Sequence, residues 1–214
     1  MTASTERTSP LGDWAGRFAS ASAAPAQFAI RERAWTAQIN LRGNPADPAF
    51  GAAVRGVLGA DLPAKANTWT ESAGQGAIWL GPDEWLLTGP EGTHAALESA
   101  LRAALRGQHH SVVDISANRT VIEIGGALAR SVLLKGCSLD LHAAAFAPPQ
   151  SAQTVLAKAQ VLMQCCAADG GPVEFRLYVR NSFAHYLAEW LTDAAAESLA
   201  ARTLDSDRIA ARLR

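Results

Sequence analysis

Hydrophobic and polar side chains alternate along several short segments of the chain, at 36–42, 77–89, 119–126, 151–164 and 174–180. Alternation with a period of two places the apolar side chains on one face of an extended chain, so each segment predicts a half-buried β-strand. The segment 77–89 contains Gly-Pro-Asp-Glu at its centre and predicts two strands joined by a turn or bulge. A tight turn at 168–172 predicts that 151–164 and 174–180 form a hairpin.

Apolar residues spaced three and four positions apart predict helices between these strands, at 50–58, 93–107, 127–136 and 183–194. Gly59 and Gly107 are candidate stop signals, and Thr93 is a candidate N-terminal cap. The order strand, helix, strand pair, helix therefore occurs twice, which favours a diverged duplication. The predicted fold class is α+β, with two related halves that are each an antiparallel sheet with helices packed on one face.

The expected organisation is a mobile N-terminal arm at 1–27, a first α+β half at 28–108, a second α+β half at 109–200 and a C-terminal tail at 201–214. The arm is rich in Ala, Ser, Thr and Pro and lacks periodicity, and Trp14 and Phe18 are the side chains through which it would dock. The tail carries four arginines diluted by two aspartates and is interpreted as a solvated helix, with docking on an acidic partner as the alternative.

Composition narrows the possible functions. The chain has 214 residues, of which 49% are hydrophobic and 18% are charged, a globular balance with enough length for a substantial core. The net charge of -1 leaves no basic excess to neutralise a phosphate backbone, which argues against nucleic-acid binding. No apolar run reaches the roughly 18 residues that cross a bilayer, and the N-terminus has no signal-peptide core. We expect a cytoplasmic protein without a membrane partner.

Cysteine and histidine patterns give little support for a metal or disulfide framework. The three cysteines are Cys137, Cys165 and Cys166, an odd number with two of them adjacent. Zinc sites favour Cys or His pairs separated by two to five residues, a spacing that the vicinal pairs Cys165–Cys166 and His109–His110 lack. The chain also shows no Gly-rich phosphate loop and no G-x-S-x-G nucleophile elbow.

The string "LLKGCSLDLH" at 133–142 brings Cys137 and His142 within five residues. A cysteine nucleophile needs a base within hydrogen-bond reach, and in proteins that base is usually distant in sequence. Because Cys137 follows an apolar helix and Gly136, a structural turn with a partly buried thiol is the favoured interpretation. A catalytic thiol and a contact with a partner are the alternatives.

The string "WLGPDEWLL" places two tryptophans on either side of a turn. Pro82 presets the turn and the Asp83 side chain can bond its own backbone. Trp79 and Trp85 either pack in the core or anchor a protein–protein interface, where tryptophan is enriched. Asp83 and Glu84 are poor candidates for paired catalytic carboxylates, since adjacent residues of a strand point to opposite faces.

Six strings, in the order "LRGNPADPAFGAAVRGVLGADLP", "IWLGPDEWLL", "DISANRTVIEI", "LLKGCSLDLH", "PPQSAQTVLAKAQVLM" and "FRLYVRNSFAHYLAEWLTDAA", resemble the gamma subunit of heterotetrameric sarcosine oxidase over about residues 30–200. That family is similar in turn to the folate-binding aminomethyltransferases, so the resemblance implies paired α+β halves. In the aminomethyltransferases the segment matching "LLKGCSL" carries Asn-Asp, and the aspartate acts on the folate-bound carbon. The matching residues here are Gly136 and Cys137, without a carboxylate, so the resemblance implies a former active-site loop kept as structure.

The resemblance also implies a holoenzyme that oxidises sarcosine to glycine, with formaldehyde or methylene-tetrahydrofolate and hydrogen peroxide as products. FAD, FMN, NAD and tetrahydrofolate would be held by alpha and beta subunits and zinc by a delta subunit, leaving no catalytic, cofactor or metal residue in this chain. The family-signature residues, which are also candidate interface residues, are Trp79, Gly81, Pro82, Asp83, Trp85, Asn118, Arg119, Lys135, Gly136 and Cys137. The alternatives are a stand-alone folate-binding aminomethyltransferase-like protein and a Cys137 hydrolase.

Overall fold

The computed structural model describes residues 7–166 and 173–212, with side chains described up to residue 200. Sheet A consists of β1 (Ala29–Arg33), β7 (Arg119–Gly125), β8 (Ser151–Leu156), β9 (Ala159–Cys166) and β10 (Glu174–Arg180). Sheet B consists of β2 (Ala37–Gly43), β3 (Trp69–Ser72), β4 (Gln75–Gly81), β5 (Glu84–Gly89) and β6 (His110–Asp114). The spatial orders are β1-β7-β10-β9-β8 and β3-β4-β5-β2-β6, and the pairings within both sheets are antiparallel.

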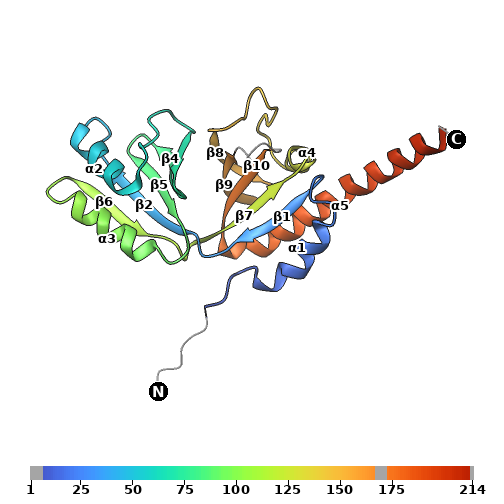
Figure 1. Cartoon of the computed structure of the whole chain (residues 1–214), viewed down its shortest axis with the longest axis horizontal. Helices are drawn as coiled ribbons and strands as arrows, with labels where there is room; N and C mark the ends of the chain where they lie inside the picture. Colours follow the sequence, from blue (N-terminus) through green and yellow to red (C-terminus); the bar gives the residue numbers. More distant parts are fainter. Residues whose placement is uncertain (1–6, 167–172, 213–214) are drawn as a thin grey trace, which may run out of the picture.

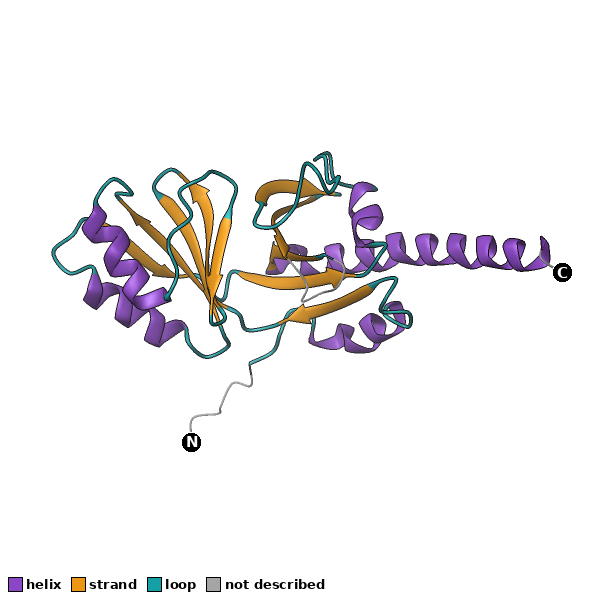
Figure 2. Cartoon of the chain, turned by 45° about the horizontal axis from the view of Figure 1, so that its top comes forward, coloured by secondary structure: helices purple, strands orange, loops and turns teal. Residues whose placement is uncertain are grey.

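Helices cover the outer face of each sheet (Figure 1). On sheet B lie α2 (Pro48–Leu58) and α3 (His94–Ala104), whose apolar side chains share one core cluster with β2, β5 and β6. On sheet A lie α1 (Ala15–Ala21), α4 (Ala129–Leu134) and α5 (Asn181–Arg212). Figure 2 shows the same arrangement, with the two helix layers at opposite sides of the molecule. The predicted α+β fold class is thereby confirmed.

The inner faces of the two sheets contact each other through a small third cluster. Ile78 and Leu86 of sheet B pack with Val121, Leu162 and Tyr178 of sheet A, and all five are at most 4% exposed. Adjacent residues on these strands point to opposite faces, so neighbours such as Leu87 serve the helix-covered cores instead. The molecule is therefore layered as helices, sheet, sheet and helices.

Local sequence accounts for the sharp ends of α2. The Asp47 side chain accepts a hydrogen bond of 2.9 Å from the backbone N–H of Ala49, and Pro48 occupies the first turn, where its missing N–H is not needed. At the other end Gly59 adopts a φ of 70°, a left-handed conformation that often ends helices. Glycine adopts this conformation without the strain that a Cβ would cause. Between these ends Phe50, Val54 and Leu58 form the buried stripe.

The ranges 28–108 and 109–200 do not coincide with the two sheets, because each sheet takes one strand from the other range. β1 precedes β2 in the chain but pairs with β7 across sheet A. β6 precedes β7 but pairs with β2 across sheet B. The division of the chain at 108/109 therefore stays a prediction, while the chain crosses between the two sheets both before β2 and before β7.

The described part of the expected N-terminal arm at 1–27 is packed against sheet A. A short 3-10 helix, η1 (Gly12–Trp14), leads into α1, and Leu11, Trp14 and Phe18 are each at most 5% exposed in the core of sheet A. The indole N–H of Trp14 donates to Nδ1 of His185 on α5 over 3.2 Å. Burial of three large apolar side chains supplies a driving force that outweighs the poor periodicity of the segment.

The prediction of a single strand at 151–164 is wrong. This alternating run is a hairpin, in which β8 and β9 pair around a turn at Ala157, whose φ is 53°. The prediction that the run pairs with 174–180 holds for β9, which pairs with β10. The turn expected at 168–172 lies outside the described residues. The tail joins α5, which continues as a helix to Arg212 and projects away from the body in Figure 1.

Candidate functional site

The β4–β5 hairpin carries the first group of signature residues. Trp79 and Trp85 are directly opposite each other, and the strand pairing shifts register between Trp79 and Gly81. Trp85 is 2% exposed, its indole N–H donates to the carbonyl of Pro63 over 3.1 Å, and its ring lies 6.0 Å from that of Phe50. Trp85 is thus a core residue, whereas Trp79 is only partly buried at the edge of the same cluster. An interface role for Trp79 stays a prediction.

The two carboxylates of the hairpin turn serve neighbouring strands. Asp83, which follows Pro82, accepts two hydrogen bonds from the Arg42 guanidinium, at 3.1 and 3.0 Å, instead of bonding its own backbone. Glu84 accepts a hydrogen bond of 2.7 Å from the Asn40 amide on β2. Both carboxylates are therefore occupied in bracing the hairpin, and nothing brings them together as an acid–base pair.

The loop after α4 carries the second group, and it is packed against α5. Lys135 donates through Nζ to the carbonyl of Ala194 and to the Glu197 carboxylate, both at 2.7 Å. Gly136 lies under the ring of Trp190, so close that an added Cβ would be 2.5 Å from Cζ2. These contacts explain the glycine and the lysine as packing residues that join the loop to the closing helix.

Cys137 is buried, at 8% exposure, and its backbone forms an isolated bridge with Leu156 at the end of β8. His142 is exposed, its ring Nδ1 accepts from the Ala144 backbone N–H, and no hydrogen bond joins it to Cys137 in the described part of the chain. The two residues are not assembled as a nucleophile and base. The structural-turn interpretation of this string fits the burial of Cys137 and its bridge with Leu156.

A pocket of about 310 Å³ lies where the β4–β5 hairpin approaches sheet A. Its lining includes Leu80, Arg119, Gln153, Gln160, Tyr178 and Arg180. Arg119 begins β7, and its carbonyl accepts a hydrogen bond of 2.9 Å from the Gln38 amide of sheet B. The neighbouring Asn118 carbonyl accepts from the backbone N–H of Asn181, which fixes the start of the strand. This pocket is where the hairpin and the signature residue Arg119 meet.

The charge distribution around Arg119 is unusual. Arg119 lies directly opposite Arg180 in the β7–β10 ladder. Burial lowers the pKa of Arg119 below its ordinary value, and the positive charge of Arg180 lowers it further, with Glu84 as the opposing influence. Sequence reasoning singled out Arg119 but not Arg180 or Gln153, because their proximity depends on strand register that the local pattern does not encode.

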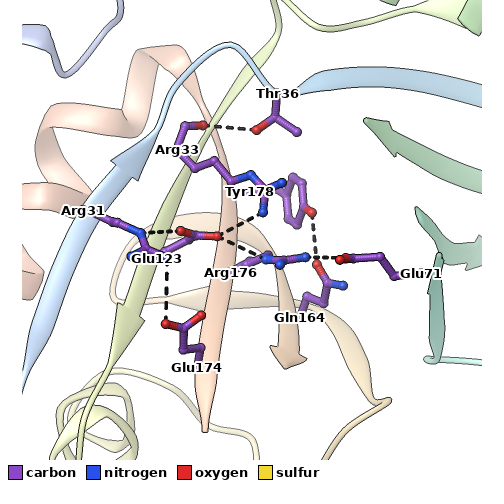
Figure 3. A network of polar contacts seen from close by, with 9 residues as sticks. All are labelled: Arg31, Arg33, Thr36, Glu71, Glu123, Gln164, Glu174, Arg176 and Tyr178. Atoms are coloured by element: carbon purple, nitrogen blue, oxygen red, sulfur yellow. Dashed lines mark hydrogen bonds and ion pairs between the residues drawn. The ribbon is translucent and has the colours of Figure 1, made fainter. Parts of the chain in front are cut away.

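A second polar cluster, centred on Glu123 of β7, lies on the inner face of sheet A (Figure 3). Its carboxylate accepts hydrogen bonds from Arg31 at 2.6 Å, Arg33 at 3.3 Å and Arg176 at 3.2 Å. Arg176 also reaches Glu71 of sheet B at 2.6 Å, so the cluster ties the two sheets together. Sequence reasoning missed it, although a glutamate inside the apolar run "VIEIGG" was a usable signal.

The electrostatics of Glu123 show a compensated buried charge. Its side chain is 6% exposed, and burial alone would raise its pKa. The hydrogen bond and charge of Arg31, with the charges of Arg33 and Arg176, outweigh burial and hold the pKa below its ordinary value of 4.5. The carboxylate is therefore ionised at neutral pH and acts as a structural counter-ion.

Candidate metal ligands and reactive thiols are not assembled in the described residues. No group of three His, Cys, Asp or Glu side chains in 7–166 and 173–200 is close enough to hold a metal ion. The thiols of Cys165 and Cys166 are buried, and burial raises the pKa of Cys166 to about 12. Within the described part of the chain, no helix has the length and apolarity that a membrane span requires.

Comparison with known proteins gives a consistent result. A model of the sarcosine oxidase gamma subunit family matches residues 42–197. The sarcosine oxidase subunit gamma of Arthrobacter sp. is 36% identical over 195 residues, 91% of this chain and 94% of that protein. The subunit gamma of Corynebacterium sp. strain P-1 is 37% identical over 169 residues, 78% of this chain and 80% of that protein.

Solved structures agree with the sequence comparisons. A chain of the heterotetrameric sarcosine oxidase from Corynebacterium sp. U-96, in complex with pyrrole 2-carboxylate, matches with a TM-score of 0.79 and 35% identity, covering 89% of this chain and 95% of that one. The glycine cleavage aminomethyltransferase T of Bartonella henselae matches with a TM-score of 0.61 at 17% identity, covering 81% of this chain and 48% of that one. The second likeness is one of fold alone.

Proposed function

The chain belongs to the sarcosine oxidase gamma subunit family, and from this premise we propose that it is the non-catalytic gamma subunit of a heterotetrameric sarcosine oxidase. That enzyme would convert sarcosine to glycine, with formaldehyde or methylene-tetrahydrofolate and hydrogen peroxide as the other products. The observation that carries the proposal is the likeness to named gamma subunits over nearly the full length of both chains. We place the complex in the cytoplasm.

The contacts at the former active-site loop support the non-catalytic part of the proposal. The positions that would carry Asn-Asp in an aminomethyltransferase are Gly136 and Cys137. Gly136 lies against Trp190 and Cys137 bridges to β8, so both serve packing. Asp140 caps the backbone N–H of His142 at 2.9 Å and is occupied there. A carboxylate available for one-carbon chemistry is therefore not supplied by this loop.

In the proposed complex the chemistry belongs to the partner subunits. Alpha and beta subunits would hold FAD, FMN, NAD and tetrahydrofolate, and a delta subunit would hold zinc. The gamma chain would contribute binding surface and stability, since oxidation of an amine requires a cofactor that side chains cannot replace. Its partners are proteins, and neither nucleic acid nor membrane is among them.

Co-expression with the alpha, beta and delta subunits tests the proposal. We expect the chain to co-elute with a yellow complex that turns over sarcosine, and to be colourless and inactive when purified alone. The Cys137→Ala variant should retain the activity of the complex, losing stability at most. Failure of the chain to co-elute would overturn the subunit role. Saturable quenching of its six tryptophans by tetrahydrofolate, in the chain alone, would favour the folate-binding alternative.

A further inference from the structure

The arginine pair at the inter-sheet pocket lacks a counter-ion within the described chain. Arg119 and Arg180 are aligned on adjacent strands and both line the pocket. Neither guanidinium makes an ion pair or a hydrogen bond with any other residue of the described part of the chain. Side chains directly opposite each other in an antiparallel ladder are close enough to interact, and like charges there are destabilising.

The same sheet shows how the chain treats arginines that it neutralises itself. Arg31, Arg33 and Arg176 converge on the single carboxylate of Glu123 (Figure 3). At the other end of the same β7–β10 ladder, no side chain of the described residues provides such a carboxylate. The acidic side chain that influences Arg119 is Glu84, which is not within ion-pair distance and is bonded to Asn40. Among the residues that the structure describes, the positive charge at the pocket therefore has no ion-pair partner.

The surroundings of the pair are those of an interface anchor. The backbone of Arg119 is fixed by the Gln38 hydrogen bond, so its side chain starts from a rigid strand. The rim is formed partly by β8, the edge strand of sheet A, where Val155 is 47% exposed. Arginine is enriched at interface hot spots, where its planar guanidinium group binds carboxylates. Two guanidinium groups beside an exposed apolar side chain on a sheet edge fit that description.

We propose that the pocket between Arg119 and Arg180 receives an acidic side chain of a partner subunit, whose carboxylate bridges the two guanidinium groups. The inference rests on the proposed subunit function and adds the place and chemistry of one contact. A carboxylate offers enough lone pairs to accept from both guanidinium forks, and such charge-assisted bonds are the strong ones in proteins. A carboxylate between the two guanidinium groups also offsets the repulsion between them, because each positive charge then lies next to the negative charge of the partner.

The test uses the co-expressed complex and two variants of the full chain. Arg119→Gln and Arg180→Gln are combined in one double variant. Arg106→Gln is the matched control, because Arg106 is exposed and lies outside the pocket. We expect the double variant to bind the remaining subunits roughly 30-fold or more weakly, and the control to stay within about twofold of the wild type. Affinity is measured by titrating labelled gamma chain into the gamma-depleted complex.

A second measurement separates interface from fold. In the isolated full-length chain, removal of two repelling charges should leave the thermal unfolding midpoint unchanged or raise it. A parallel fall of stability and affinity would overturn the proposal, because the arginines would then support the fold. Wild-type affinity in the double variant would overturn it while leaving the subunit role intact.

A third arm tests a carboxylate from solution. Malonate is titrated into the isolated wild-type chain and the double variant. If malonate raises the unfolding midpoint of the wild type alone, while the double variant still assembles normally, the anion comes from solution and the proposal is overturned. If wild-type chain does not assemble with the oxidase subunits at all, the subunit role fails, and this contact fails with it.

Discussion

The loop after α4 makes the sharpest prediction, through Gly136. A Cβ added at Gly136 would be 2.5 Å from Cζ2 and 2.8 Å from Cη2 of Trp190, and 3.1 Å from the backbone nitrogen of Ala157. Carbon atoms in proteins normally approach to about 3.5–4.0 Å, so the indole ring would have to move by roughly 1 Å. Trp190 lies on α5 and is partly buried against the core of sheet A, so a displaced ring would lose some of its packing there.

The magnitude follows from two opposing effects. Overpacking of a well-filled site destabilises by about 1–3 kcal/mol. The φ angle of Gly136 lies outside the left-handed region, so alanine fits its backbone and gains about 0.4–1 kcal/mol by restricting the unfolded chain. We therefore expect Gly136→Ala to lower the free energy of unfolding by a net ~1–2 kcal/mol.

Urea unfolding of the full chain measures this effect, and a double-mutant cycle assigns it. In a Trp190→Leu background the added methyl group has space, so Gly136→Ala should cost less than ~0.5 kcal/mol there. Gly51→Ala is the matched control: Gly51 lies inside α2, nothing would be within 4 Å of its new Cβ, and alanine there should stabilise by about 0.5–1 kcal/mol. A neutral Gly136→Ala, or the same cost in both backgrounds, would refute the reasoning.

Three further predictions concern the charge cluster, the thiols and the division of the chain. Glu123→Gln leaves the Arg31, Arg33 and Arg176 guanidinium groups without their shared anion, so we expect a loss of about 3–5 kcal/mol at pH 7 in urea unfolding. Because the pKa of Glu123 is held below 4.5, the stabilisation by its carboxylate is present above pH 4.5 and is lost as the pH falls. The difference in the free energy of unfolding between wild type and variant should therefore be smaller at pH 3 than at pH 7, and an unchanged difference would contradict this. All three cysteines are buried, so thiol reagents should modify the native chain slowly and three thiols should react on unfolding; one fast thiol would disprove the burial. Fragments 1–108 and 109–214 should each lack native circular dichroism alone and regain it when co-expressed, since each sheet needs a strand from the other fragment; an independently folded fragment would count against this.

The sequence predicts those elements whose signal is local. The helix α2 is predictable from its apolar spacing and from Gly59, and β2 and β7 from their alternation. β1 and β6 are short and carry charged or histidine side chains, so their strand character comes from pairing with residues that are distant in sequence. The turn at Ala157 has no glycine or asparagine to mark it, although its φ is positive, and the β8–β9 hairpin was hidden for that reason.

The same distinction, between local signals and contacts that are distant in sequence, applies to the site. The sequence alone favours a structural turn around Cys137, because a nucleophile and its base at short spacing on a loop are poorly placed to meet. The alignment of Arg119 with Arg180 depends on strand register across 61 positions of sequence, and the closure of their pocket depends on a hairpin from the other sheet. Those are tertiary properties, and local pattern does not carry them.

The exchange of strands between the two sheets bears on the predicted duplication and on the placement of the pocket. The first unit runs β1, β2, α2, β3, β4, β5, α3, and the second runs β6, β7, α4, β8, β9, β10, α5. The corresponding strands have the same spatial order, β3-β4-β5-β2 and β8-β9-β10-β7, and the leading strand of each unit completes the sheet of the other. The matching element order and strand order of the two units are what a duplication would leave, so they agree with the predicted duplication. Both crossings of the chain also link the two sheets covalently, and the pocket lined by Leu80 of sheet B and Arg119 of sheet A lies where the sheets approach each other.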